Sequence, residues 1–197
     1  MIIYFRFMRT KDNIKQEALF EATIKLVNEI GFASSSVSKI AKEAGISPAT
    51  IYVYYKNKED LLVSTYIEIK RNMSKAVQKD FDDSLPIRDV LKNIWFKIFQ
   101  YVSTHSAYFQ YAEQFSNSPY NSLVDKQEIE KYFDPMIQVI IKGIEQKIIK
   151  NVNFEILTAF IFYPIIALSN PRICQDFDLS DENIETAFKL AWDAIRF

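Results

Sequence analysis

The segment from residue 34 to residue 62, SSSVSKIAKEAGISPATIYVYYKNKEDLL, constrains the fold more than any other part of the chain. After hydroxyl residues that can cap a helix, its first half places four apolar residues on one face at helical spacing: Val37, Ile40, Ala41 and Ala44. Gly45 supplies the backbone freedom that a tight turn needs. Ser47 and Pro48 form a start signal for a second helix, because serine caps free N–H groups and proline has none to lose there. The segment therefore predicts two short helices joined by a glycine turn, which is a helix-turn-helix.

The second of these helices suits the DNA major groove, where the second helix of a helix-turn-helix binds. Ile51 and Tyr55, four residues apart, share its inward face. The residues left for its outer faces and first turn are Ala49, Thr50, Tyr52, Val53 and Tyr54. Small Ala49 permits close approach, Thr50 can hydrogen-bond a base edge or offer its methyl group to thymine, and the two outer tyrosines can reach phosphates. Lys58, at the start of the next helix, is predicted to bind a phosphate.

Charge is distributed unevenly along the 197 residues, although the net charge is only −1. Residues 1–58 carry 9 Lys and Arg against 5 Asp and Glu, whereas residues 59–197 carry 15 against 20. The basic end is the end that contains the helix-turn-helix. This asymmetry favours a nucleic-acid partner for that end of the chain.

The residues of this region resemble the tetracycline-repressor (TetR) family of bacterial transcriptional regulators. The resemblance covers about the first third of the chain and lies in Gly31-Phe32, Ser35-Ser36-Val37, Ile40-Ala41, Ala44-Gly45-Ile46-Ser47, Thr50-Ile51-Tyr52, Tyr54-Tyr55 and Lys58-Glu59-Asp60-Leu61-Leu62. It implies DNA-contact positions at Ser36, Ser47, Ala49, Thr50, Tyr52, Tyr54 and Lys58. For Ser36 and Ser47, helix capping alone is an equally supported role. Val53 stands where a larger or polar residue often occurs in the family, so no base preference is carried over.

The whole chain is predicted to be all-α, with about nine helices. Its 3 glycines and 6 prolines leave room for long helices. Residues 1–57 are expected to form a three-helix DNA-binding head that contains the helix-turn-helix. Residues 58–197 are expected to form a helical body, which the resemblance implies is the effector-binding and dimerisation domain.

Capping and breaking residues place the individual helices. Asp12 or Asn13 caps the first helix and Gly31 ends it, with a buried stripe of Ala18, Leu19, Ala22, Leu26 and Ile30. Later helices are expected at 58–83, 86–104, 106–115, 153–169 and 181–197, with a loop at 116–122. Residues 124–133 are predicted to form a short helix and a longer one to restart at Asp134 and Pro135. A single helix kinked at Pro135 is the alternative.

Aromatic residues are dense in the body. Ordinary core packing explains any single one of them well. Together they also suit a pocket for a flat or greasy small molecule, and the resemblance strengthens that hypothesis because family members usually carry an effector pocket here. The predicted ligand-binding residues are Trp95, Phe96, Phe99, Tyr111, Phe115, Phe133 and Met136. His105, the only histidine, is expected to be solvent-exposed or to cap a helix.

The last two predicted helices carry more apolar surface than one neighbour in a small body would cover. Their stripes are Ile156, Ala159, Phe160, Tyr163 and Ala167, and Ile184, Ala187, Phe188, Ala191, Trp192 and Ile195. The resemblance implies that these helices pair with those of a second subunit as a four-helix bundle. The predicted dimer-interface residues are Phe160, Tyr163, Phe188 and Trp192.

The resulting hypothesis is a homodimeric, ligand-responsive repressor of a palindromic operator on double-stranded DNA, released by a small hydrophobic or aromatic effector. An enzyme is disfavoured, because no catalytic or metal-ligating constellation and no phosphate-binding glycine loop is present; no cofactor and no metal are expected. A helical small-molecule carrier or interaction protein without DNA binding is the remaining alternative. The lone Cys174 and the absence of a membrane-length apolar run fit a cytoplasmic protein with no membrane partner. Met8 is the expected natural start.

Overall fold

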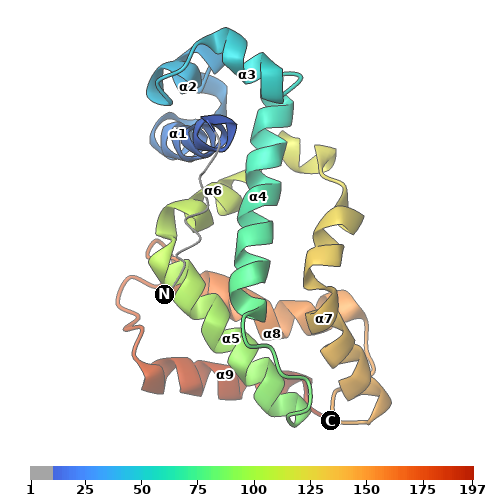
Figure 1. Ribbon diagram of the computed structural model, residues 1–197. Helices are drawn as coiled ribbons and strands as arrows, with labels where there is room; N and C mark the ends of the chain where they lie inside the picture. The colour runs from blue at the N-terminus through green and yellow to red at the C-terminus, as the bar shows by residue number, and fades with distance from the viewer. Residues whose placement is uncertain (1–10) are drawn as a thin grey trace, which may run out of the picture. The chain divides into compact units, whose positions relative to one another are not determined.

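The computed structural model describes residues 11–197, and the expected start at Met8 lies outside them. The described chain is all-α, as predicted, with nine α-helices and one 3-10 helix (Figure 1). The helices are α1 (Lys11–Ser34), α2 (Val37–Glu43), α3 (Pro48–Tyr54), α4 (Lys58–Gln78), α5 (Ile87–Thr104), α6 (Ser106–Ser116), η1 (Pro119–Leu123), α7 (Lys126–Glu145), α8 (Phe154–Ser169) and α9 (Asp181–Ile195).

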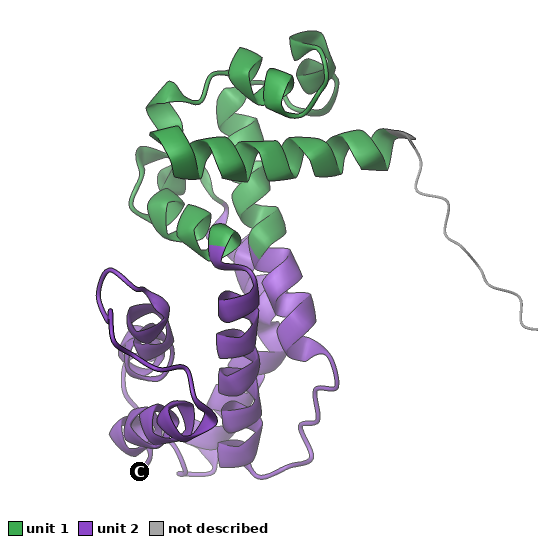
Figure 2. Cartoon of the chain, turned by 90° about the vertical axis from the view of Figure 1, so that its left-hand side faces the viewer, with its two compact units in different colours: residues 1–69, 107–124 green, residues 70–106, 125–197 purple. Residues whose placement is uncertain are grey.

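The chain forms two compact units, coloured separately in Figure 2. Of the described residues, unit 1 contains 11–69 and 107–124, and unit 2 contains 70–106 and 125–197. Most of α6 and all of η1 therefore belong to the same unit as the helix-turn-helix. The functional division expected at residue 57 is a different partition and stays a prediction.

Helices α1, α2, α3 and α4 all contribute to the core of unit 1. It contains Leu19, Ala22, Ile40, Ala41, Ile51 and Leu61, all buried. The apolar faces predicted for the two short helices thus lie in this core, with Val37 and Ala44 packed at its margin. Ile30 of the predicted α1 stripe is 40% exposed, because Gly31 has φ 74 and ψ 167 and interrupts the helix at the next residue. Val27 completes the buried face of α1 instead.

Helix α6 is fastened to α1 and α4 within unit 1. The Tyr111 hydroxyl donates a hydrogen bond of 2.9 Å to the Leu62 carbonyl, and burial raises the pKa of this phenol. The Phe32 ring packs edge-on against both Tyr111 and Phe115, at 5.5 and 5.9 Å between ring centroids. Asn28 donates to the Ala107 carbonyl at 2.8 Å. Aromatic packing with a satisfied buried hydroxyl therefore assigns α6 to this unit.

Unit 2 is built around Trp95 of α5, which is fully buried. Its Nε1 donates to the Ile161 carbonyl of α8, and its ring lies 5.7 Å from the Phe188 ring of α9. Helix α8 turns Leu157, Ile161 and Ile165 into the core, whereas α9 buries most of its predicted stripe. One tryptophan thus contacts both of the last two helices.

Two predicted boundaries are corrected by the structure. Helix α7 is one helix that runs through Pro135, so the restart predicted there is wrong and the single-helix alternative holds. Its continuous buried face, Met136, Val139, Ile140 and Gly143, gives a packing gain that offsets the hydrogen bond lost at proline. Helix α4 ends at Gln78 rather than Asp83, and Asp80 beyond it takes a left-handed φ of 58.

Of the described helices, none combines the length and apolar character needed to cross a membrane.

Candidate nucleic-acid interface

Both short helices of the helix-turn-helix begin at a capping serine. The Ser36 side chain accepts a hydrogen bond from the Lys39 N–H, and the Ser47 side chain accepts one from the Thr50 N–H, each at 3.3 Å. The Ser47 and Thr50 hydroxyls also lie 2.9 Å apart. Capping therefore accounts for both serines, and their predicted DNA contacts stay a prediction.

Helix α3 has a buried face and an outward face. Ile51 is fully buried, whereas Tyr52 is 57% and Val53 is 75% exposed. Ala49 is exposed as well and lies one turn before Val53, so the two share a face with Tyr52. The outward face is thus small and largely apolar at its centre, and it lies on the side of the helix opposite the buried Ile51.

Tyr54 lies differently from the prediction that placed it on an outer face. It is half-buried against the core of unit 1, and its hydroxyl donates to Asp12 Oδ1 at 2.9 Å. This hydrogen bond raises the pKa of Tyr54. The contact joins residues 42 positions apart, and the hydroxyl is therefore directed at α1.

Lys58 is also engaged inside unit 1. Its Nζ donates to the Phe32 carbonyl at 2.6 Å, just after the break in α1 at Gly31. The side chain is half-buried, so its position at the start of α4 is as expected but its ammonium group binds a carbonyl in this structure. A phosphate contact at Lys58 requires the ammonium to share or exchange that partner.

The predicted ligand-binding residues fall into separate clusters. Tyr111 and Phe115 belong to unit 1, whereas Trp95, Phe96, Phe99, Phe133 and Met136 belong to unit 2. Trp95 and Phe99 pack together at 4.9 Å between ring centroids. Phe96 and Phe133 are half-buried, whereas Met136 is buried. The seven residues therefore do not form one lining within either unit.

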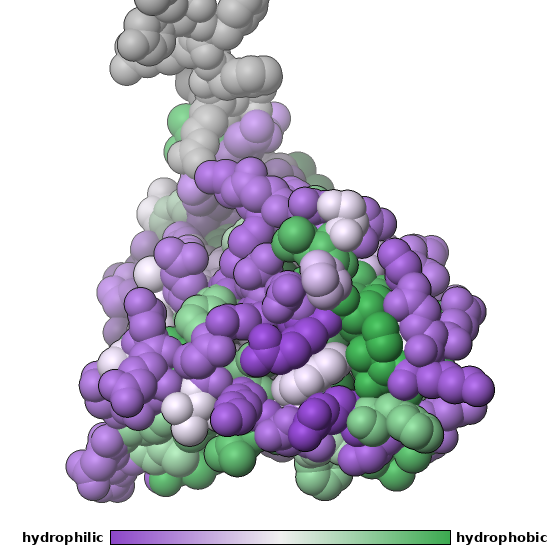
Figure 3. Space-filling view, turned by 90° about the horizontal axis from the view of Figure 1, so that it is seen from below, coloured by the Kyte–Doolittle hydropathy of each residue, from purple (hydrophilic) through white to green (hydrophobic). Residues whose placement is uncertain are grey.

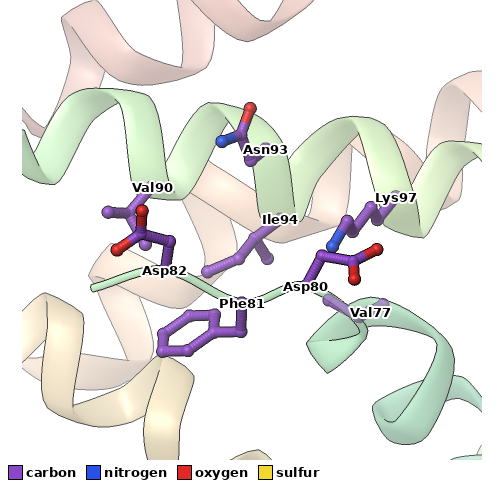
Figure 4. Close-up of a pocket in the computed structure, with 8 residues that line it drawn as sticks. All are labelled: Val77, Asp80, Phe81, Asp82, Val90, Asn93, Ile94 and Lys97. Atoms are coloured by element: carbon purple, nitrogen blue, oxygen red, sulfur yellow. The ribbon is translucent and has the colours of Figure 1, made fainter. Parts of the chain in front are cut away.

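One small hollow lies in unit 2, between the segment that follows α4 and one face of α5. Figure 4 shows Asp80, Phe81 and Asp82 on that segment, and Val90, Asn93, Ile94 and Lys97 on α5. The volume is about 10 Å³. This is room for roughly one water molecule, too little for an effector.

Two buried hydroxyl groups of the described chain that lack a hydrogen-bond partner were not predicted from the sequence. Among the described residues, Tyr101 Oη and Ser169 Oγ are buried side-chain atoms without a hydrogen-bond partner. Burial raises the pKa of Tyr101 to about 12. The Tyr101 ring stacks on His105, which caps the end of α5 as expected, at 4.3 Å between centroids. No local pattern marks a hydroxyl that tertiary packing leaves without a partner.

The four predicted interface residues divide into two pairs. Phe160 and Tyr163 on α8 are 56% and 63% exposed. Phe188 and Trp192 on α9 are 0% and 6% exposed because they pack in the core of the protomer, and their predicted interface role stays a prediction. Further exposed apolar residues of the last two helices are Ile156, Ile166 and Leu190. Figure 3 shows that hydrophobic residues also gather in a band among hydrophilic ones on the face it presents.

Residues 11–197 contain no group of three or more His, Cys, Asp or Glu side chains that could hold a metal ion.

Comparisons with known proteins agree with this geometry. A profile described as bacterial regulatory proteins of the tetR family matches residues 19–65. A second, described as the tetracyclin repressor-like C-terminal domain, matches residues 86–196, more than half of the chain. The chain belongs to the TetR family. Its membership makes it a transcriptional regulator with a helix-turn-helix that binds DNA, and its matched relatives are regulators rather than enzymes.

Individual TetR-family relatives match along nearly the whole chain. The crystal structure of a TetR family transcription regulator from Marinobacter aquaeolei VT8 superposes with a TM-score of 0.87 at 34% identity, covering 96% of this chain and 99% of that one. An HTH-type transcriptional regulator from Haemophilus influenzae is 25% identical over 189 residues, which are 96% of this chain and 100% of that protein.

Proposed function

We propose that this TetR-family protein is a homodimeric repressor of a palindromic operator, released from DNA by a small hydrophobic or aromatic effector. The outward face of α3 carries the proposal. Ala49, Tyr52 and Val53 are exposed on a helix whose opposite side is held by the fully buried Ile51. Exposed apolar side chains on a short anchored helix add little to the stability of the fold, but they suit insertion into a groove.

The dimer is supported by α8. Ile156, Phe160 and Tyr163 follow one another at helical spacing, and each is more than half exposed. A contiguous exposed apolar stripe marks an interaction surface. Two copies that pair through it would present two α3 helices, which a palindromic operator requires at about 34–36 Å, one turn of DNA.

The effector response is supported by the unpartnered hydroxyls of unit 2. A buried hydroxyl without a partner costs about 1–3 kcal/mol. An effector with a polar atom beside an apolar body would recover that cost at Tyr101 or Ser169 while packing against the aromatic core. The Trp95 and Phe99 rings are buried in the same unit and belong to that aromatic core.

Helix α4 is the proposed link between effector and DNA. It contributes residues 58–69 to unit 1 and residues 70–78 to unit 2, and it contains neither glycine nor proline. We expect the effector to bind more tightly to a conformation of α4 in which the protein binds DNA less well. Effector binding then lowers the DNA affinity, and DNA lowers the effector affinity, by one coupling free energy.

A gel shift with DNA from upstream of the protein's own gene tests the proposal. A salt-sensitive shift that unrelated DNA does not compete away is expected. Absence of any shift at low salt would contradict the repressor and favour the carrier without DNA binding. For the effector, native mass spectrometry of protein purified from its own cells identifies a co-purified molecule, which is then added to the shifted complex. Release of the DNA is expected; an undiminished shift would contradict the effector role.

A further inference from the structure

The recognition helix is poor in groups that read bases by paired hydrogen bonds. Its sequence, PATIYVY, contains no Arg, Lys, Asn, Gln, Asp or Glu. Arg and Lys read guanine, Asn and Gln read adenine, and acidic residues read cytosine. Bidentate readout of these bases is therefore not available to the side chains of α3.

The hydroxyl groups of α3 are largely committed within unit 1. Thr50 Oγ1 lies 2.9 Å from Ser47 Oγ, and the Tyr54 hydroxyl donates to Asp12. Tyr52 remains as the residue that carries an exposed hydroxyl on the outward face. A single hydroxyl both donates and accepts, so it distinguishes bases weakly.

Val53 and Ala49 make the outward face apolar instead. Val53 is the most exposed of the described large hydrophobic side chains of unit 1, at 75%. Ala49 lies four residues before it on the same face. In the major groove, the apolar group that a base edge offers is the C5-methyl of thymine.

We propose that α3 recognises its operator half-site through thymine methyl groups, with Val53 as the main contact and Ala49 one turn away. The inference rests on the proposed DNA-binding function and names the chemistry of its specificity. Sequence preference then follows the pattern of methyl groups in the groove, while Tyr52 holds the helix on the phosphate backbone.

Replacement of thymine by uracil tests this directly, because uracil lacks only the methyl group and keeps every hydrogen-bonding edge. The probe is the short duplex most enriched from a random duplex library by the full-length protein, synthesised with thymine or with uracil in both half-sites. Each contacted methyl is expected to contribute about fourfold in affinity, so one per half-site gives about 16-fold. Single replacements then locate the contacted position.

Two valine variants assign the contact. Val53→Ala is expected to bring the ratio of thymine to uracil affinity close to one. Val152→Ala makes the same change at an exposed valine of unit 2 and is expected to keep the wild-type ratio. Equal affinity of the wild-type protein for both duplexes, or a full ratio in Val53→Ala, would overturn the inference. If no duplex is enriched from the library, the proposed DNA-binding function is contradicted as well. If an enriched duplex is bound equally with thymine and with uracil, only the proposal about thymine methyl groups is contradicted.

Discussion

Replacing Phe160 with alanine is expected to weaken dimerisation by about three orders of magnitude. A phenylalanine side chain buries about 150–250 Å² when fully covered. Because Phe160 is 56% exposed in the protomer, about 100 Å² of it is available to a partner. At about 25 cal/mol per Å², this is roughly 2.5 kcal/mol for each protomer and about 5 kcal/mol for the two copies. The surface that alanine retains lowers the loss to about 4 kcal/mol, a factor of about 10³ in Kd.

Sedimentation velocity over a wide concentration range measures this Kd. Leu123→Ala is the matched control, because Leu123 is also 56% exposed but lies in unit 1. The control is expected to sediment like the wild-type protein, and Phe160→Ala to dissociate at concentrations where the control is dimeric. An unchanged Kd for Phe160→Ala would refute the reasoning, since the exposed stripe of α8 would then lie outside the interface.

Two other substitutions test the roles of single side chains. Lys58→Met keeps the length of the side chain but removes its charge, so the salt slope of DNA binding should fall by about 0.9 per protomer, or about 1.8 for a dimer; an unchanged slope in a fluorescence anisotropy titration would leave Lys58 only its bond to the Phe32 carbonyl. Burial raises the pKa of Tyr101 from 10.0 to about 12, so the unfolded chain ionises first as the pH rises. The stabilisation by the neutral phenol is complete below pH 10 and lost between pH 10 and 12. Urea unfolding midpoints should therefore fall over this interval more in the wild-type protein than in Tyr101→Phe, and equal falls would contradict the burial of that phenol.

Local signals predicted the helix-turn-helix well. Gly45, Ser47 and Pro48 act on their own backbone, so their effect does not depend on the rest of the fold. Gly45 indeed has φ 68, and Ser47 caps α3. The buried Ile40 and Ile51 follow from helical spacing alone.

Contacts between distant residues were beyond local signals. The hydrogen bond from Tyr54 to Asp12 and that from Lys58 to Phe32 depend on tertiary packing, and sequence spacing could not show that these two side chains have partners inside the unit. Tyr111 of α6 was likewise predicted to line an effector pocket. In the structure it packs against Phe32 and donates a hydrogen bond to the Leu62 carbonyl, both in unit 1.

The last two helices show a different limit. Both Phe160 and Phe188 lie on apolar stripes with helical spacing, which cannot distinguish a face for the protomer core from a face for a partner. The structure separates them because Trp95 packs on Phe188, whereas Phe160 stays exposed. Pro135 was ambiguous for a similar reason, since a proline can begin a helix or lie within one.

The affinity of Ala49→Glu for the operator duplex tests the central claim most directly, because it places a carboxylate on the exposed outward face of α3 without disturbing a buried residue. If that face meets the major groove, repulsion from the phosphates and the added bulk should lower the affinity by at least about a hundredfold while thermal unfolding stays unchanged. DNA binding as tight as that of the wild-type protein would show that α3 does not contact the operator.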